Sequence, residues 1–401
     1  MKNKYVLTAL SSIFIVFIFY LCFHVIAKDY SDKSLKAGFI YIGDTSTAYT
    51  YNFYVAQKEL EESFGDKVTT IAKFNVPENK KEVARAVEDL ITNNCNIIFA
   101  TSFGYEEFIK EYAQKYPQIQ FCQATGVLAN EAPVLPNYHN FMGIIYEGRY
   151  ISGIVAGLKL KELVETRKIL PAQEKIGYVA AFPFAEVISG YTAFFLGVRS
   201  VMPDAVMSVM YTDSWNNYFI EKKCAQKLIE EGCVIISQHS DTTGPAIACE
   251  EASMNNGTVV YHVGYNQSMI DVAPTTSLVS SRINWSHYIL GACNAVLKEK
   301  PIESVVKGTV YGNDIGAGIQ NDWVEIIGLN ELITAPETVE KIEAAKKQFK
   351  SGGASIYKGN YLGVNPYNPS DIWNLNTPFI ENQKRSAPSF CYVLQDVITV
   401  E

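Results

Sequence analysis

Apolar runs that end abruptly in small polar residues recur along the chain and indicate buried strands. Residues 97–100 (IIFA) form one such run, and a helical pattern follows the polar turn after it. Because ligands bind beyond the carboxyl ends of strands in an open parallel sheet, Ser102 and Phe103 are candidate ligand contacts. Residues 234–236 lead in the same way into a polar loop with Gln238, His239, Ser240 and Asp241. Two matching strand edges predict two lobes that face one cleft.

Strands and helices alternate steadily from residue 36 onward, which predicts an α/β fold with doubly wound parallel sheets. Helices are expected at residues 54–64, 79–93, 106–116, 150–162, 186–200, 219–230 and 246–255, with apolar strands between them. The alternation restarts after residue 145 without a linker. We therefore expect two lobes joined by a hinge, with chain crossings near residues 142–147, 265–269 and 282–285.

The expected first lobe comprises residues 36–145 and 286–307, and the second comprises residues 146–285 and 308–355. The last segment, residues 356–401, is rich in proline and aromatic residues. Its prolines disfavour a long helix, and its aromatic side chains are too apolar for a solvated disordered tail. We expect this C-terminal extension to wrap onto a lobe, and a partner-binding segment is the alternative.

The first 28 residues have the pattern of a signal peptide or signal anchor. Lys2 and Lys4 precede an apolar run, residues 5–27, in which His24 is the only titratable basic or acidic residue. A run of this length suffices to span a bilayer, and its small last residue also offers a cleavage site. Cleavage and retention both stay open, and either places the remaining chain outside the cytoplasm, in a periplasm or at the cell surface.

Charge and cysteine usage exclude several function classes. The chain has a formal net charge of −8 and no clusters of lysine and arginine, which argues against nucleic-acid binding. Of its 8 cysteines one lies in the leader, and the others are scattered without a CxxC motif, so neither a disulfide framework nor a zinc site is expected. No cofactor or metal is expected. Cys95, Cys122 and Cys233 border apolar strands and are expected to be buried.

Aromatic residues gather at the predicted strand ends. The loop expected at residues 43–53 contains Tyr49 and Tyr51 where a phosphate-binding loop would need a glycine-rich motif, which argues against a nucleotide phosphate. Trp215 and Trp285 also fall in or beside loops that follow predicted strands. Such rings suit a flat ligand with a π-system, because stacking stabilises it beyond simple burial.

Several segments together resemble the basic membrane protein family of solute-binding proteins for ABC transporters, which includes bacterial receptors for purine nucleosides. The segments are YTYNFYVAQKELEESFGDKV, IIFATSFGYEEF, YEGRYISGIVAG, KIGYVAAFPFAEVISGYTAFFLGVRSVMPDA, DSWNN, VIISQHSDTTGP, HVGYNQSM and the NW pair at residues 284–285. They extend over most of residues 38–298. None of them is specific alone, and their joint occurrence in this order carries the resemblance.

The resemblance implies a periplasmic-binding-protein type I fold that closes on a purine nucleobase or nucleoside and passes it to an ABC transporter permease. By position, Tyr51 and Trp215 would sandwich the purine, and Asp241 would accept a hydrogen bond from its edge. Asn266 stands where nucleoside-binding members carry an aspartate for the ribose, and Ile283 or a neighbour stands where they carry a lysine. A free nucleobase such as adenine is therefore the expected ligand. The residues expected to bind it are Tyr49, Tyr51, Ser102, Phe103, Phe182, Trp215, Asp241, Gly264, Asn266 and Trp285.

Two other functions remain open at this stage. A nucleoside-processing enzyme would use Asp241, His239 and Glu147 as acids or bases, but the chain lacks GxSxG, HExxH and any local Cys–His signature. We therefore expect no enzyme, and we expect His239 to hydrogen-bond backbone groups in its own loop. A membrane-anchored ligand-sensing domain is the other alternative, although no signalling domain follows on this chain.

Overall fold

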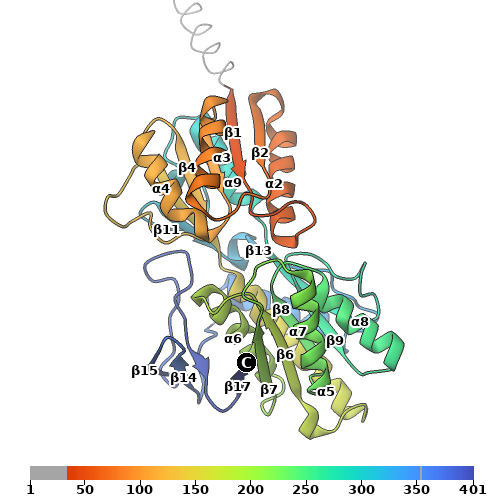
Figure 1. Cartoon of the computed structure of the whole chain (residues 1–401). Coiled ribbons are helices and arrows are strands. Elements are labelled where there is room, and N and C mark those ends of the chain that lie inside the picture. Colours follow the sequence, from red (N-terminus) through yellow and green to blue (C-terminus); the bar gives the residue numbers. More distant parts are fainter. Residues whose placement is uncertain (1–33, 353–354) are drawn as a thin grey trace, which may run out of the picture.

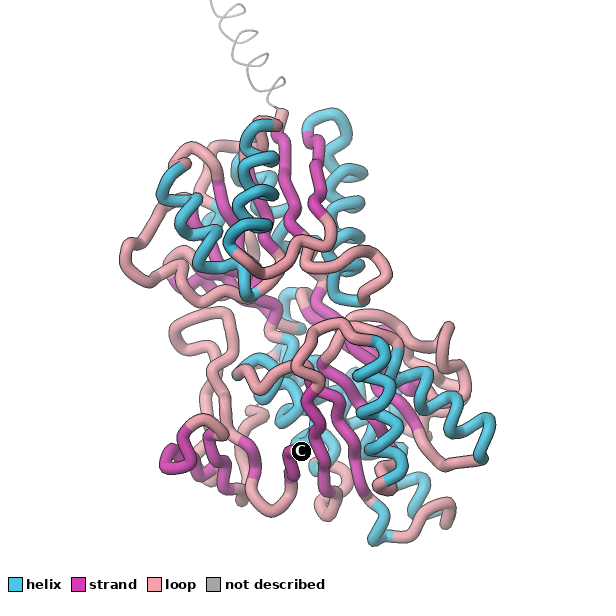
Figure 2. Tube along the Cα trace, viewed as in Figure 1, coloured by secondary structure: helices cyan, strands magenta, loops and turns pink. Residues whose placement is uncertain are grey.

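Two α/β lobes, one above the other in Figure 1, make up the computed structural model of the chain. The structure describes residues 34–352 and 355–401, so the expected signal segment at residues 1–28 lies outside the described residues. Among the residues that are described, no helix is both long and apolar enough to cross a membrane. Loops gather where the two lobes meet, and the strands of both sheets run toward that junction (Figure 2).

The first lobe is built on a seven-stranded sheet with the order β11-β12-β5-β4-β3-β1-β2. Its strands are β1 (Leu35–Ile40), β2 (Val68–Lys73), β3 (Ile97–Ala100), β4 (Gln120–Ala124), β5 (Tyr138–Gly143), β11 (Thr309–Tyr311) and β12 (Asp314–Ala317). All neighbours are parallel except the β11–β12 pair. Helices α2 and α9 pack together on one side, and α3 and α4 pack together on the other. These helices are α2 (Ala48–Phe64), α3 (Lys80–Thr92), α4 (Glu106–Lys115) and α9 (Ser286–Leu297).

The second lobe repeats this design with the strand order β13-β10-β9-β8-β6-β7-β17, in which only β10 and β13 are antiparallel. Its strands are β6 (Lys175–Ala180), β7 (Val206–Tyr211), β8 (Ile235–His239), β9 (Tyr261–Tyr265), β10 (Ser277–Ile283), β13 (Val324–Ile327) and β17 (Ile398–Val400). Its helices are α5 (Ile145–Glu165), α6 (Ala185–Arg199), α7 (Tyr218–Glu230), α8 (Gly244–Asn256) and α10 (Thr338–Lys350). The short 3₁₀ turns of the two lobes are η1 (Gly65–Lys67), η2 (Phe103–Tyr105), η3 (Pro171–Gln173), η4 (Ile302–Ser304) and η5 (Ile319–Asn321).

Close contact between α5 and α6 explains two glycines in the second lobe. A Cβ atom on Gly153 would overlap the carbonyl oxygen of Phe194, and one on Gly197 would overlap that of Tyr150. The two backbones can approach this closely only because neither glycine carries a side chain. The same two helices place Arg149 and Glu186 beside the junction of the lobes.

Burial on both faces of the sheets explains why the strands are continuous apolar runs. All four residues of β3 are buried, as the pattern at residues 97–100 predicts. Cys95, Cys122 and Cys233 are buried free thiols, which confirms their expected place in the cores.

Within residues 34–352 the chain crosses between the lobes three times: from β5 to α5, from β10 to α9, and from β12 to β13. The third crossing differs from the expected one at residues 265–269, because β9 and β10 are neighbours in the second sheet. The expected boundary at residue 308 differs as well, since β12 pairs with β5 and therefore belongs to the first lobe. Apolar runs mark buried strands, but they do not say at which sheet edge a strand is added.

The C-terminal extension lies beside the second lobe and reaches up to the edge of the first lobe that faces it (Figure 1). It forms a small antiparallel sheet of β14 (Leu362–Asn365), β15 (Asn368–Asn374) and β16 (Val393–Leu394), and β17 then pairs with β7 of the second lobe. The backbone N–H of Ser386 donates to Asp314 Oδ2 in the first lobe at 2.7 Å. The ring of Tyr357 stacks on Phe390 with centroids 4.2 Å apart. The extension is therefore a packed wrap, as expected, and it contacts both lobes.

Candidate ligand-binding site

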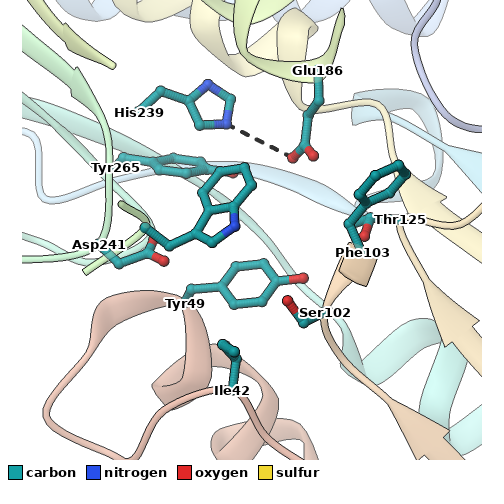
Figure 3. Close-up of a pocket in the computed structure, with 10 residues that line it drawn as sticks. Ile42, Tyr49, Ser102, Phe103, Thr125, Glu186, His239, Asp241 and Tyr265 are labelled. Carbon is teal, nitrogen blue, oxygen red and sulfur yellow. Dashed lines mark ion pairs between the residues drawn. The ribbon is translucent and has the colours of Figure 1, made fainter. Parts of the chain in front are cut away.

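A narrow cavity lies between the lobes at the carboxyl ends of the strands (Figure 3). The first lobe contributes Ile42, Tyr49, Ser102, Phe103 and Thr125, and the second contributes Glu186, Trp215, His239, Asp241 and Tyr265. The cavity holds about 30 Å³, which is space for roughly one or two water molecules. The lobes have thus closed on each other, and a larger ligand requires them to separate first.

Both strand edges singled out from the sequence meet at this cavity. Ser102 and Phe103 follow β3 of the first lobe, while His239 and Asp241 stand at and after the end of β8 of the second. Trp215 arrives from the loop between β7 and α7. The rule that ligand sites lie beyond parallel strand ends therefore holds for both lobes.

Tyr49 faces the cavity and Tyr51 does not. The sequence predicted a loop through residue 53, whereas helix α2 begins at Ala48 and includes both tyrosines. Residues two positions apart on a helix point to different sides, so only one of them can line the site. The Tyr49 hydroxyl donates to the Thr101 carbonyl oxygen at 2.6 Å, while Tyr51 is 40% exposed and is absent from the lining. The expected sandwich of Tyr51 and Trp215 is therefore not assembled in this structure.

Two further aromatic residues from the expected set support the lining from behind. Trp285 is only 1% exposed; it stacks on Phe53 with centroids 4.3 Å apart and meets Tyr49 edge-on at 6.3 Å. Phe182 belongs to the second lobe, as Trp215 does, and the two rings meet edge-on with centroids 5.2 Å apart. Neither side chain belongs to the cavity lining. Instead, Trp285 packs against Tyr49 and Phe182 packs against Trp215, and both of these partners line the cavity.

Asp241 is the acidic end of a buried hydrogen-bond chain. Asn266 Nδ2 donates to Asp241 Oδ1 at 3.2 Å, and Asn52 Nδ2 donates to Asn266 Oδ1 at 3.2 Å. The backbone N–H of Ala48 also donates to the Asp241 carbonyl oxygen at 3.1 Å. Burial raises the pKa of Asp241 well above its usual range, and the nearby charge of Glu221 adds to this effect. Asn266 is thus a bridge between the lobes and does not line the cavity.

Gly264 belongs to the expected set but lies within β9, outside the cavity lining. A Cβ at this position would overlap Ser280 Oγ on the neighbouring strand. The glycine therefore permits close packing between β9 and β10, and this packing explains its place without a ligand contact.

His239 and Glu186 face each other in the cavity, with 3.7 Å between His239 Nε2 and Glu186 Oε1 (Figure 3). This distance is too long for a hydrogen bond. Neither ring nitrogen of His239 has a hydrogen-bond partner in the described part of the chain, so the expected bond to its own loop backbone is wrong. Burial lowers the pKa of His239, which keeps the imidazole neutral at neutral pH.

Arg149 is a fully buried cation next to the cavity. Its guanidinium carbon lies 3.8 Å from the ring centroid of Tyr265, over the ring face. Within the described residues none of its three guanidinium nitrogens has a hydrogen-bond partner. Its positive charge contributes to the lowered pKa of His239. The Tyr265 ring thus lines the cavity and also contacts a buried charge.

Sequence reasoning missed Ile42, Thr125, Glu186 and Tyr265 as lining residues. Each of them stands near a strand end: Ile42 after β1, Thr125 directly after β4, Tyr265 at the end of β9, and Glu186 near the start of the helix after β6. The same rule about strand ends that indicated Ser102 would have identified them.

The three titratable residues considered for acid–base chemistry do not converge. His239 and Asp241 line the cavity, but Glu147 lies at the crossing from β5 to α5 and is not part of the lining. Its Oε2 accepts a hydrogen bond from the backbone N–H of Ile319 at 2.8 Å. Glu147 therefore connects two chain crossings of the hinge.

The family model described as ABC transporter substrate-binding protein, PnrA-like, matches residues 37–359. The chain belongs to this family. A purine-binding protein of Brucella abortus (strain 2308) is 30% identical to the PnrA-like chain over 332 residues, which cover 82% of the chain and 85% of that protein. A Haloferax volcanii protein named as an ABC transporter glucose-binding protein is 29% identical over 331 residues, with coverages of 82% and 75%.

Solved structures agree with the fold of the PnrA-like chain. An ABC transporter solute-binding protein from Aeropyrum pernix K1 superposes with a TM-score of 0.62 and covers 79% of this chain and 92% of that one. Their sequence identity is 14%, so this likeness shows the fold alone. The fold is that of periplasmic-binding-protein type I, which confirms the two-lobed α/β architecture implied by the sequence.

Proposed function

We propose that this ABC-transporter substrate-binding protein captures a purine nucleobase, with adenine as the expected ligand, and releases it to a membrane permease. One observation carries the proposal: Tyr49 and Trp215, from opposite lobes, line the same cavity as the buried carboxyl group of Asp241. Two rings suit the faces of a flat base, and a carboxyl group suits its N–H edge. Tyr49 takes the role that the sequence assigned to Tyr51.

The two kinds of contact supply different parts of recognition. Stacking of a base on an aromatic side chain contributes roughly 1–3 kcal/mol and hardly distinguishes one base from another. A buried polar edge does distinguish them, because a mismatched ligand leaves a buried group without a partner at a cost of about 1–3 kcal/mol. Asp241 accepts one side-chain hydrogen bond from the described residues, at Oδ1. Its other oxygen is therefore available to a ligand N–H.

The environment of Asn266 favours a free base over a nucleoside. This side chain already donates to Asp241 and accepts from Asn52. It would have to break these bonds to hold ribose hydroxyls as a carboxylate would. The purine-binding relative from Brucella abortus supports the same class of ligand.

Binding without catalysis completes the proposal. The ligand is held, leaves unchanged, and passes to the permease on the outer side of the membrane. Chromatography of purines and nucleosides incubated with the protein should recover them intact. Turnover that disappears in the Asp241→Asn variant would instead support a nucleoside-processing enzyme. A membrane-anchored sensor would bind the same ligand without a permease.

A ligand screen tests the proposal directly. Thermal unfolding would be followed with adenine, guanine, hypoxanthine, adenosine and glucose, the last because of the relative from Haloferax volcanii. A ligand present at a hundred times its dissociation constant stabilises the folded state by about 2.7 kcal/mol, which shifts the unfolding temperature visibly. Stabilisation by adenine supports the proposal. Stabilisation by glucose with no response to any purine would overturn it.

A further inference from the structure

A second, larger chamber adjoins the ligand cavity. Four residues line both spaces: Phe103, Thr125, Glu186 and Trp215. The chamber holds about 500 Å³, against about 30 Å³ for the cavity that contains Asp241. A ligand bound at Asp241 therefore has a neighbouring space into which a substituent can extend.

Three parts of the chain form the walls of the chamber. Val127 and Met142 come from the first lobe, and Phe184 and Ala185 come from the second. The C-terminal extension contributes Tyr367, Arg385, Ala387 and Pro388 to a further wall. The family match ends at residue 359, so this last wall lies outside the part of the chain shared with the family model.

Contacts with both lobes fix the wall that the extension provides. Ser386, between Arg385 and Ala387, donates its backbone N–H to Asp314 in the first lobe at 2.7 Å. The hydroxyl of Tyr367 donates to the Pro183 carbonyl oxygen in the second lobe at 2.7 Å. The chamber is thus bounded by packed chain on this side in the closed state.

The chemistry of the walls favours an uncharged, apolar occupant. Most lining side chains are apolar, and the rings of Phe103 and Phe184 lie 5.8 Å apart across the two lobes. The charged groups in the lining are Glu186 and Arg385, which have opposite signs. A charged substituent would therefore meet one attractive and one repulsive group and gain little net attraction, whereas a hydrocarbon one gains from burial.

We propose that the chamber accommodates an apolar arm carried by the purine, so that the protein prefers bases with a hydrocarbon substituent to the bare base. This inference rests on the proposed function, because it places the base beside Asp241 and the arm between Phe103, Phe184 and Ala387. The C-terminal extension then determines which substituent is accepted, and the two lobes, which the family shares, recognise the base.

Calorimetric titration of the purified protein with adenine, N6-benzyladenine and 9-benzyladenine tests the inference. The two benzyl compounds carry the same arm on different sides of the purine. At least one of them should bind about tenfold more tightly than adenine, because a phenyl group leaves water for an apolar chamber. If adenine binds and neither benzyl compound binds better, this inference is wrong and the proposed function stands. If none of the three binds, the proposed function fails as well.

A pair of variants tests whether the higher affinity for the benzyl compound arises in the chamber. Ala387→Phe fills the chamber from the extension, and Ala185→Phe fills it from the second lobe. Either substitution should abolish the preference for the benzyl compound and leave the affinity for adenine within about twofold, which also shows that the variant has folded. Ala344→Phe, the same change at an exposed position of α10, is the matched control and should keep the preference. Equal loss of adenine and benzyladenine binding in both chamber variants would show that the chamber holds the base itself, and would overturn the inference.

Discussion

The side chain of Asn52 in the first lobe donates a hydrogen bond to Asn266 in the second, with 3.2 Å between Nδ2 and Oδ1. Both residues are buried, at 5% and 1% exposure. Asn266 in turn donates to Asp241, so the same chain of amides that joins the lobes also positions the carboxyl group at the cavity. Lobe closure and the orientation of Asp241 are thereby coupled.

Replacing Asn52 by alanine should favour the open arrangement of the lobes. The loss of one buried hydrogen bond costs about 0.5–1.5 kcal/mol, so ligand affinity should fall roughly two- to tenfold. Small-angle X-ray scattering of the free protein should give a larger radius of gyration. Asn93→Ala, which removes a hydrogen bond to Asp89 within one lobe, is the control and should change neither quantity. Unchanged scattering and affinity for Asn52→Ala would contradict the coupling.

Tyr49 and Tyr51 offer a matched pair for testing the site. Tyr49→Ala should weaken adenine binding by roughly 1–3 kcal/mol, the usual effect of losing a base–aromatic stack. Tyr51→Ala should leave the affinity within about twofold, because this side chain is half exposed and lies on another side of α2. Isothermal titration calorimetry of both variants measures the difference. A larger loss of affinity in Tyr51→Ala than in Tyr49→Ala would instead support the Tyr51–Trp215 sandwich expected from the sequence.

Trp215 and Asp241 should differ in the kind of effect they have on binding. Trp215→Ala should weaken the binding of adenine, guanine and hypoxanthine equally, by roughly 1–3 kcal/mol, because stacking energy depends little on which base is bound. Asp241→Asn should instead change the order of affinities, because an amide presents a donor where the carboxyl group offers an acceptor. Titration of the three bases into each variant decides the matter. A Trp215→Ala variant that binds like the wild type, or an unaltered order in Asp241→Asn, would refute these roles.

Glu147 should make stability depend on pH. Burial raises its pKa from 4.5 to about 7, although the backbone N–H of Ile319 donates to it. The folded state therefore holds a proton that the unfolded state releases near pH 4.5, and the wild type loses stability as the pH rises from about 4.5 to 7. Glu147→Gln imitates the protonated form and should escape this loss.

Urea unfolding of the wild type and Glu147→Gln between pH 4 and 8 would measure the effect. The stability gap in favour of the glutamine variant should widen with pH by at most about 1.4 kcal/mol per unit and level off near neutrality. Below the ordinary pKa both side chains are uncharged and the gap should close. A gap that stays constant over the whole range would show that Glu147 does not carry the dependence.

Many elements of the site followed from local pattern, and the misplacement of Tyr51 has a clear physical cause. Ser102, Phe103, Trp215 and Asp241 lie in the cavity lining because each follows an apolar strand that a parallel sheet must bury on both faces, and their contact with a ligand stays a prediction. Tyr51 was misplaced because α2 starts several residues before its regular apolar pattern does. Once the helix includes Tyr49, its periodicity removes Tyr51 from the cavity.

The sequence alone determined the class of fold, the two lobes and the aromatic character of the cavity, because strand–helix alternation and apolar runs are local properties of the chain. The family resemblance came from the order of particular sequence segments. Only the tertiary structure decided that β12 joins the first sheet, that Trp285 lies behind Tyr49, and that Glu186 faces His239. It also decided that Ala387 of the extension lines a chamber beside the cavity. These relationships join residues far apart in sequence, and such pairs are selected by which buried surfaces fit together, which no local pattern encodes.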